Sequence, residues 1–458
     1  MRALHHPVIA CVIALATAVT ALSCTHRAAD DSANQLTLTP GQLGGIYAAY
    51  PEPDTLQLTP APEGYEPFYI SHYGRHGSRY QPNDSRYLNT LQRLQDGHAR
   101  GVLTPYGEQL LPQIQLLCDS CLGHGGQLSR VGERQLRGIG QRMARTYPAL
   151  FERCVEARSS VVDRCIASMH AFADGLSSGL GRPLDTDHFI MSADSSDMSV
   201  IAYDSPAMRH LNDKQAAWRI AYDDYSRRHV DRTALVQRLF TDAADVDTFQ
   251  LAVDLYWLAV GMQDIDVPGC DLSGVFTYDE LMQCYQCVNY RMYVCNANNP
   301  QSQGIPAQSA SSLLADIISR ADSAIVLVHD TAHDVAPGAD LRFGHDSNLL
   351  RLLALMHVHG ADVVVDSPAD AWRAWHEYQL SPMAANLQLV FYRPADPEGD
   401  VLVKILLNER ETTLDNLSLL PVTGPYYRWS EVRSALLSQL PDVDSQSIGD
   451  DTIVVNIQ

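Results

Sequence analysis

The sequence predicts an α/β fold: a mostly parallel sheet flanked by helices, with an inserted, mainly helical cap domain. Two stretches of the chain alternate between short apolar strands and amphipathic helices, and a polar, cysteine-bearing, mostly helical stretch separates them. Such alternation is typical of parallel sheets, and a helical run within it is typical of an insertion. The chain has 458 residues, of which 46% are apolar, enough for one large core or two moderate ones. We therefore expect residues 36–184 and 336–458 to form the α/β domain and 185–335 to form the cap.

The first alternating stretch follows a proline-rich segment at 51–67. An apolar run predicts a buried strand at 68–73, and a second short strand is expected at 155–160. Between them, residues 126–150 have the apolar period of a helix, through Leu128, Val131, Leu136, Ile139, Met143 and Leu150. After the second strand, another helix is indicated by Ile166, Met169, Phe172 and Leu176.

The cap and the second alternating stretch contain further expected elements. Cap helices are expected at 215–230, 234–240 and 248–260. Beyond the cap, the expected elements are a strand at 341–344, a helix carrying Leu349, Leu350, Leu352, Leu353 and Met356, and late strands at 386–393 and 401–408.

The first 24 residues are expected to be an export signal rather than part of the fold. Arg2 precedes an apolar run at 8–22, which is too short for a comfortable membrane span. Ala-Leu-Ser-Cys at 21–24 resembles a bacterial lipobox, in which Cys24 would be lipidated and become the first residue. We expect an exported protein that is anchored by Cys24 at the outer membrane or in the periplasm and has no other membrane contact. Ordinary cleavage, which would give a soluble secreted protein, is the alternative.

The charge of the chain restricts its partners. The formal net charge of −21 argues against nucleic acid, whose phosphates require a basic surface. Only Lys214 and Lys404 are lysines, so nearly all positive charge is arginine, whose planar fork suits phosphate. An acidic protein that binds an anion must concentrate its arginines locally.

The cysteines are expected to be structural. Apart from Cys11 and Cys24 there are eight, and an even count in an exported chain favours disulfides whose connectivity the sequence leaves open. Cys-x-x-C pairs at 118–121 and 284–287 could also indicate zinc or thiol redox chemistry, but they lie far apart and follow no clear strand. Cys154 and Cys165 bracket the second strand, and we expect them to pair.

The first segment with chemical character is 73–79, Tyr-Gly-Arg-His-Gly-Ser-Arg, which ends the first buried strand. Ligands of open α/β sheets lie at the carboxyl ends of strands. A histidine nucleophile must be neutral, and Arg75 and Arg79 would lower the pKa of His76 while neutralising phosphoryl oxygens. Gly74 and Gly77 are expected to let the backbone approach a substrate closely.

The second segment is 341–348, Leu-Arg-Phe-Gly-His-Asp-Ser-Asn, where a strand again runs into a helix N-terminus. Such an end attracts anions. His345 can donate to a phosphoryl oxygen, and Asp346, if protonated, can pass its proton to a leaving oxygen. Two other His-Asp pairs begin at His329 and His333, with the spacing of a helical metal pair, but no third ligand is evident.

The third segment is 158–168, which joins the end of the second strand to a helix. Arg164 lies at this junction and is therefore expected to converge on the same pocket as His76 and Asp346. A single arginine usually lies on the surface, but the position of Arg164 after a strand favours a place in the site.

At these residues the chain resembles the histidine acid phosphatases, branch 2 of the histidine phosphatase superfamily, which include bacterial phytases and multiple inositol polyphosphate phosphatases. The family motif Arg-His-Gly-x-Arg-x-Pro matches at 75–79, with Gln81 at the proline position and Pro82 after it. The family's His-Asp matches at 345–346, and its third arginine matches Arg164. The resemblance covers most of the chain after residue 65.

The resemblance implies a two-step mechanism without a metal or other cofactor. His76 would take the phosphoryl group, Asp346 would protonate the alcohol, and water would then hydrolyse the phosphohistidine. Charge on the phosphoryl group would be spread by the substrate-binding residues Arg75, Arg79, Arg164 and His345.

The substrate is expected to be a small phosphomonoester, with inositol polyphosphates ranked first. Eukaryotic inositol polyphosphate phosphatases carry His-Ala-Glu where this chain has His-Asp-Ser at 345–347, so sugar-phosphate or general acid phosphatase activity stays open. Phytate would need basic residues beyond the catalytic ones, and Arg86 and Arg351 are candidates. A phosphoglycerate-mutase-like activity and a non-catalytic lipoprotein that binds phosphorylated glycans are the remaining alternatives.

Overall fold

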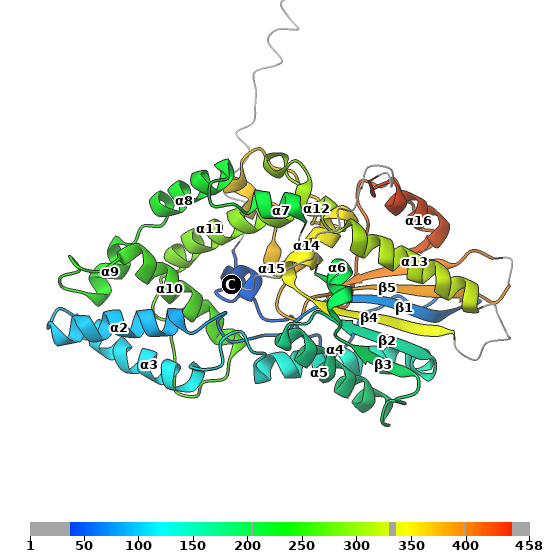
Figure 1. The fold of residues 1–458 in the computed structure, drawn as a ribbon, viewed down its shortest axis with the longest axis horizontal. Coiled ribbons are helices and arrows are strands. Elements are labelled where there is room, and N and C mark those ends of the chain that lie inside the picture. The colour runs from blue at the N-terminus through cyan, green and yellow to red at the C-terminus, as the bar shows by residue number, and fades with distance from the viewer. Residues whose placement is uncertain (1–36, 203–204, 329–335, 397–398, 442–458) are drawn as a thin grey trace, which may run out of the picture. The chain divides into compact units, whose positions relative to one another are not determined.

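The fold is built on a mixed sheet with strand order β3-β2-β4-β1-β5-β6-β7, in which β8 also pairs with β6 (Figure 1). The neighbouring pairs β3–β2, β2–β4 and β4–β1 are parallel, whereas β1–β5, β5–β6, β6–β7 and β6–β8 are antiparallel. The strands are β1 (Tyr65–Arg75), β2 (Cys154–Ser159), β3 (Phe189–Ser192), β4 (Pro337–Gly344), β5 (Asn386–Pro394), β6 (Leu402–Leu407), β7 (Arg410–Glu411) and β8 (Tyr426–Arg428).

The coordinates are a computed structural model that describes residues 37–202, 205–328, 336–396 and 399–441. The expected signal segment with Cys24, and the His-Asp pairs at His329 and His333, lie outside the described residues. No helix among those that are described combines the length and apolarity needed to cross a bilayer.

The α/β class with a helical region is confirmed, but the sheet is mixed rather than mostly parallel. Asn386 at the start of β5 pairs with Gly74 near the end of β1, so β5 begins at the edge where β1 and β4 finish. The chain between β4 and β5 therefore returns to the edge it left instead of crossing the sheet, and an antiparallel strand must follow. β5 is buried along most of its length, as a parallel strand would be, which is why its apolar pattern did not reveal its direction.

Helices cover both faces of the sheet. α13 (Ser311–Val328) and α14 (Asp346–Leu355) contact β1 on one face, and α16 (Trp429–Leu437) contacts α13. On the other face, α5 (Asp163–Leu180) contacts β2 and β4 and packs closely against α4 (Arg130–Thr146). The helices expected around 126–150 and after 160 are therefore present, with their apolar sides inward.

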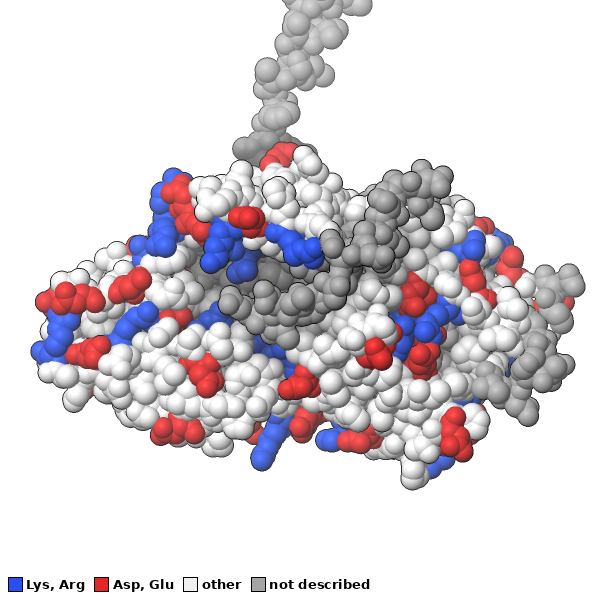
Figure 2. Space-filling view, in the orientation of Figure 1, with Lys and Arg blue, Asp and Glu red and all other residues white. Residues whose placement is uncertain are grey.

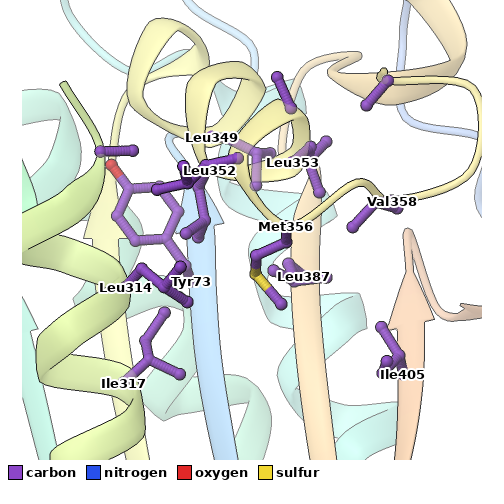
Figure 3. Packing of buried hydrophobic residues seen from close by; sticks show 14 of the residues in the cluster. Tyr73, Leu314, Ile317, Leu349, Leu352, Leu353, Met356, Val358, Leu387 and Ile405 are labelled. Atoms are coloured by element: carbon purple, nitrogen blue, oxygen red, sulfur yellow. The ribbon is translucent and has the colours of Figure 1, made fainter. Parts of the chain in front are cut away.

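Two hydrophobic clusters fill the layers on either side of the sheet. Because side chains alternate along a strand, Tyr69 and Tyr73 of β1 join one cluster and Ile70 joins the other. Figure 3 shows the first cluster, in which leucines of α14 lie over the strands beside Tyr73. This packing fixes the N-terminus of α14 at the end of β4.

The helical part of the molecule is assembled from more of the chain than 185–335. α2 (Ser85–Ala99) and α3 (Pro105–Cys121) pack against α10 (Thr248–Gly261) and α9 (Thr233–Leu239), respectively. The other long helices here are α8 (Ala217–His229) and α11 (Tyr278–Asn296), which contact each other. Conversely, β3 and α13 fall within 185–335 and belong to the sheet layers. Local periodicity identifies helices but not the partner on which each one packs.

The expected pairing of Cys154 with Cys165 is wrong. Cys154 begins β2 beside Pro337, whereas the Cys165 thiol contacts the carbonyl of Gly344 (3.3 Å). Pro337 and Gly344 are the two ends of β4, which lie about 23 Å apart at a rise of roughly 3.3 Å per residue. A disulfide needs Cα atoms within about 7 Å. All eight cysteines of the described segments are free thiols, so the expected disulfide framework is not present there.

Candidate active site

Three strand ends bring the candidate residues together. β1, β4 and β2 are parallel neighbours, with Arg75 opposite Gly344 and Ser159 opposite Phe343, so they end at one edge of the sheet. Each is followed by a loop or a helix N-terminus that carries predicted site residues. The structure thus gathers all six of them at this edge: Arg75, His76, Arg79, Arg164, His345 and Asp346.

His76 lies at the centre of this group. The residue is 2% exposed, and the centroid of its ring is 5.8 Å from that of His345. Nδ1 lies 2.8 Å from the carbonyl oxygen of Gly77, which can only accept, so Nδ1 carries the proton and Nε2 keeps a free lone pair. Burial, then the charges of Arg75 and Arg164, hold the pKa of His76 well below its usual value. The imidazole is therefore neutral and nucleophilic at neutral pH.

The three arginines offer N–H groups that the protein itself does not use. Arg75 is fully buried, and its Nη1 donates to the carbonyls of Ile46 (2.6 Å) and Ser381 (2.7 Å). Within the described segments, buried nitrogens of Arg75 (Nε and Nη2), Arg79 (Nε) and Arg164 (Nε) have no hydrogen-bond partner. Buried polar groups rarely stay unsatisfied, so this arrangement is that of an anion site.

His345 caps α14 and lies against Arg164. Arg164 Nη2 is 3.4 Å from Nδ1 of His345, and Ser160 Oγ is 3.3 Å from Nε2. Because a guanidinium only donates, Nδ1 accepts and Nε2–H is the donor of this ring. Burial, then Arg164, lowers the pKa of His345 to about 4, so it is a neutral donor.

Asp346 is the carboxylate of the site. Its Oδ2 is 3.6 Å from Nη2 of Arg75. Burial alone would raise its pKa, but Arg75, His345 and Arg79 outweigh burial and hold the pKa below the usual value. Asp346 is therefore ionised before substrate arrives. A phosphate dianion against the same arginines would raise its pKa again, which is what a proton donor requires.

Gly74 and Gly77, which flank Arg75 and His76, serve packing rather than substrate approach. A Cβ on Gly77 would lie 2.7 Å from the Cα of Gly132 and 2.6 Å from Leu136 Cδ2, so the loop sits directly on α4. A Cβ on Gly74 would meet the ring of His72 at 2.7 Å. The two glycines were expected to admit the substrate. Instead, close contacts within the protein leave no room for a side chain at either position.

A cavity of about 590 Å³ opens beside the site and is strongly basic. Arg79 and Asp346 line it together with Arg86, Arg219, Arg291 and Arg351. Asp223, the other acidic residue of the lining, pairs with Arg219 at 3.3 Å. In the orientation of Figure 2, several basic side chains gather toward the middle of the visible face. The structure places both Arg86 and Arg351 on this cavity, as the sequence suggested.

Sequence reasoning missed how Arg86 is held. Its Nη1 donates to Oε1 of Gln81 (2.6 Å), and its guanidinium lies 5.1 Å from the ring centre of Trp257. Gln81 Nε2 in turn donates to the carbonyl of Trp257 (2.7 Å). Gln81 stands where the family motif has proline, and that departure was the signal available in the sequence.

No group of three or more His, Cys, Asp or Glu side chains in the described part of the chain is arranged to hold a metal ion.

Comparison with known proteins gives concordant results. Residues 74–408 match the family model of the histidine phosphatase superfamily (branch 2). The chain is 23% identical to human (Homo sapiens) multiple inositol polyphosphate phosphatase 1 over an alignment of 407 residues, and the match covers 81% of this chain and 79% of that protein.

Solved structures share the fold. The Bifidobacterium longum multiple inositol polyphosphate phosphatase in complex with inositol hexasulfate has a TM-score of 0.68 at 17% identity, covering 90% of this chain and 100% of that one. The phytase from D. castellii has a TM-score of 0.61 at 17% identity, covering 90% and 89%.

Proposed function

Because this chain belongs to branch 2 of the histidine phosphatase superfamily, and is therefore a phosphomonoester hydrolase, we propose that it acts on inositol polyphosphates through a phosphohistidine intermediate. The neutral, tautomerically fixed His76 supports the intermediate. The basic cavity supports the substrate class, and it is the observation on which that assignment depends.

In the first step, Nε2 of His76 attacks phosphorus, and the bond between phosphorus and the ester oxygen breaks. Arg75, Arg79 and Arg164 hold the phosphoryl oxygens, together with the Nε2–H donor of His345. Asp346, which takes up a proton as the substrate dianion binds and raises its pKa, delivers that proton to the departing alcohol oxygen. In the second step, water attacks the phosphohistidine, Asp346 takes the proton back, and His76 and inorganic phosphate are released. The arginines supply the positive charge throughout, so the proposed route uses no metal ion.

The cavity suits a substrate with several phosphates. A single phosphoryl group would occupy Arg75, Arg79 and Arg164. The cavity beyond them is lined by Arg86, Arg219, Arg291 and Arg351, whose charges would attract phosphates that are not being cleaved. In a chain of net charge −21, this local excess of arginine needs a polyanionic ligand to explain it. The human relative is named for inositol polyphosphates, and the Bifidobacterium longum structure holds inositol hexasulfate.

We expect kcat/KM for phytate to exceed that for glucose 1-phosphate. Replacing both Arg219 and Arg291 by alanine should lower kcat/KM for phytate by at least about tenfold, since each charge-assisted hydrogen bond contributes roughly 1.5–3 kcal/mol. The same double variant should leave turnover of a small aryl phosphate nearly unchanged.

The matched control is Arg433→Ala, which removes an arginine paired with Asp322 and remote from the cavity lining. This variant should change neither kcat/KM for phytate nor turnover of the aryl phosphate. A clear preference of the wild-type enzyme for glucose 1-phosphate would overturn the inositol assignment in favour of a sugar phosphatase, and would leave the chemistry of His76 intact.

We also propose that the protein is exported and lipid-anchored through Cys24. The apolar run at 8–22 and the lipobox-like residues 21–24 support this location. The wild-type protein should then fractionate with membranes, and Cys24→Ala should release it into the soluble fraction. Cys11→Ala is the control and should remain with membranes. Equal solubility of the wild type and Cys24→Ala would instead indicate ordinary secretion.

A further inference from the structure

Ser78 faces away from the phosphoryl site. It anchors residues 76–79, which we call the nucleophile loop. Its N–H donates to Gln135 Oε1 of α4 (2.9 Å), and its carbonyl accepts from the N–H of Ser129 (2.9 Å). Its hydroxyl donates to Oδ1 of Asp264 (2.6 Å). Ser78, Gln135 and Ser129 are all buried, so the backbone between His76 and Arg79 is held from behind by three separate contacts.

Asp264 reaches this loop from a distant part of the chain. It ends the short helix η4 (Met262–Asp264), directly after α10, and it is fully buried. Its carbonyl accepts from the hydroxyl of Ser129 (2.6 Å), which ties η4 to the start of α4. Oδ2 has no hydrogen-bond partner among the residues that the structure describes. The charged groups that act on this carboxyl are Arg75 and Arg79.

We propose that Asp264 is a positioning residue of the phosphatase reaction, which holds the nucleophile loop through Ser78 and competes with the substrate for the charge of Arg75 and Arg79. The proposal rests on the phosphatase activity and not on the choice of inositol phosphates. No motif residue of the site lies near position 264 in the sequence.

The competition follows from the shared arginines. When Asp264 is ionised, it offsets part of the positive charge that the phosphoryl group would meet; when it is protonated, that charge is fully available. Burial raises the pKa of Asp264 to about 7, against the opposing effects of Ser78, Arg75 and Arg79. Protonation of Asp264 therefore strengthens phosphate binding, and ionisation near neutral pH weakens it.

The neighbouring groups do not titrate in this range. The pKa of His345 is lowered to about 4, the pKa of His76 is held well below its usual value, and the pKa of Asp346 is held below its usual value. Glu377 is a second buried carboxyl whose pKa burial raises to about 7. A change in substrate binding between about pH 6 and pH 8 is therefore assigned to Asp264 by its disappearance in Asp264→Asn.

The test compares Asp264→Ala and Asp264→Asn with the wild type on a chromogenic aryl phosphate. Asp264→Ala loses the Ser78 anchor and should lower kcat/KM by roughly tenfold to a hundredfold at every pH, because small displacements of catalytic groups cost this much. Asp264→Asn keeps an acceptor for Ser78 but has no charge. Its kcat/KM should equal that of the wild type near about pH 5 and exceed it severalfold near about pH 8. The ratio of variant to wild type cancels the titration of the substrate.

Thermal unfolding gives a readout that is independent of activity. Since the folded pKa of Asp264 is raised above its unfolded value, the stability it confers is complete at low pH and is lost as pH rises from the ordinary carboxyl value of 3.8 to about 7. The Tm of Asp264→Asn relative to wild type should therefore increase across this range.

Asp254→Asn is the matched control, since Asp254 is a buried carboxylate on α10 that pairs with Arg93 (2.8 Å) away from the loop. Its ratio of kcat/KM to wild type should be constant with pH.

If Asp264→Ala does not fold, Ser78→Ala tests the positioning role instead. It removes the same hydrogen bond, between Ser78 and Asp264, but deletes only a hydroxyl group. It should also lower kcat/KM, and its effect should not add to that of Asp264→Ala. Wild-type kcat/KM in folded Asp264→Ala or Ser78→Ala would overturn the positioning role. If the ratio of kcat/KM in Asp264→Asn to kcat/KM in the wild type stays constant from about pH 5 to pH 8, Asp264 does not compete with the substrate for the charge of the arginines.

Discussion

Replacing His76 by alanine should abolish turnover of every phosphomonoester, with a loss on the order of 10⁴-fold or more. The variant removes the atom that accepts the phosphoryl group. The thiol of Cys165 lies 3.8 Å from Nε2 of His345, but burial raises its pKa to about 11, so it is protonated and a poor substitute. The neighbouring His345 cannot substitute, because its Nδ1 accepts from Arg164 and its Nε2 carries a proton, so neither ring nitrogen has a free lone pair. Initial rates on an aryl phosphate, which needs little help from the protein beyond the nucleophile, measure the effect directly.

Folding controls keep this result interpretable. The variant should retain binding of inorganic phosphate, since Arg75, Arg79 and Arg164 are unchanged, and its Tm should show that it is folded. His98→Ala, on the exposed surface of α2, is the matched histidine control and should retain full activity. Appreciable activity in a folded His76→Ala protein would exclude His76 as the nucleophile.

Replacing Asp346 by asparagine should separate esters by their leaving groups. An alkyl phosphate such as glucose 1-phosphate needs a proton on the departing oxygen, whereas an activated aryl phosphate departs without one. A general acid contributes about 10²–10⁴-fold, so kcat for the alkyl ester should fall by that factor while kcat for the aryl ester falls much less. The quantity to measure is the ratio of the two kcat values in variant and wild type.

The asparagine keeps the shape of Asp346 but also removes the charge that faces Arg75 at 3.6 Å. Loss of charge alone would change both esters similarly, so the ratio isolates the proton transfer. Asp223→Asn, which neutralises the other acidic residue of the cavity lining, should leave the ratio unchanged. Equal slowing of both esters in Asp346→Asn would make Asp346 structural and assign the proton to another group.

The grouping of the candidate site residues was predictable because it depends on a local rule. Arg75, Arg164 and His345 each stand where a buried strand ends, and parallel neighbours end at one edge, so three distant segments had to meet. Apolar periodicity likewise predicted α4 and α5, since each buries one side on the sheet. Arg86 and Arg351 followed from the chemical demand of a polyanionic substrate rather than from any pattern.

What the sequence did not reveal depends on partners distant along the chain. Asp264 lies 186 residues from Ser78, and nothing near it marks a carboxyl that will be buried against the nucleophile loop. Arg219 and Arg291 lie on α8 and α11, where periodicity shows a helix but not which side meets the cavity. Cys154 and Cys165 are close in sequence but lie at opposite ends of β4. Their proximity along the chain therefore gave a wrong prediction of a disulfide.

The most direct test of the account is to trap the covalent intermediate. The enzyme would be mixed with ³²P-labelled substrate and denatured during turnover, and the labelled peptide would be sequenced under alkaline conditions, in which phosphohistidine survives. The account predicts label on His76, present in the wild type and absent from His76→Ala. Label on a serine, or turnover with no labelled protein at any time point, would contradict a phosphohistidine mechanism.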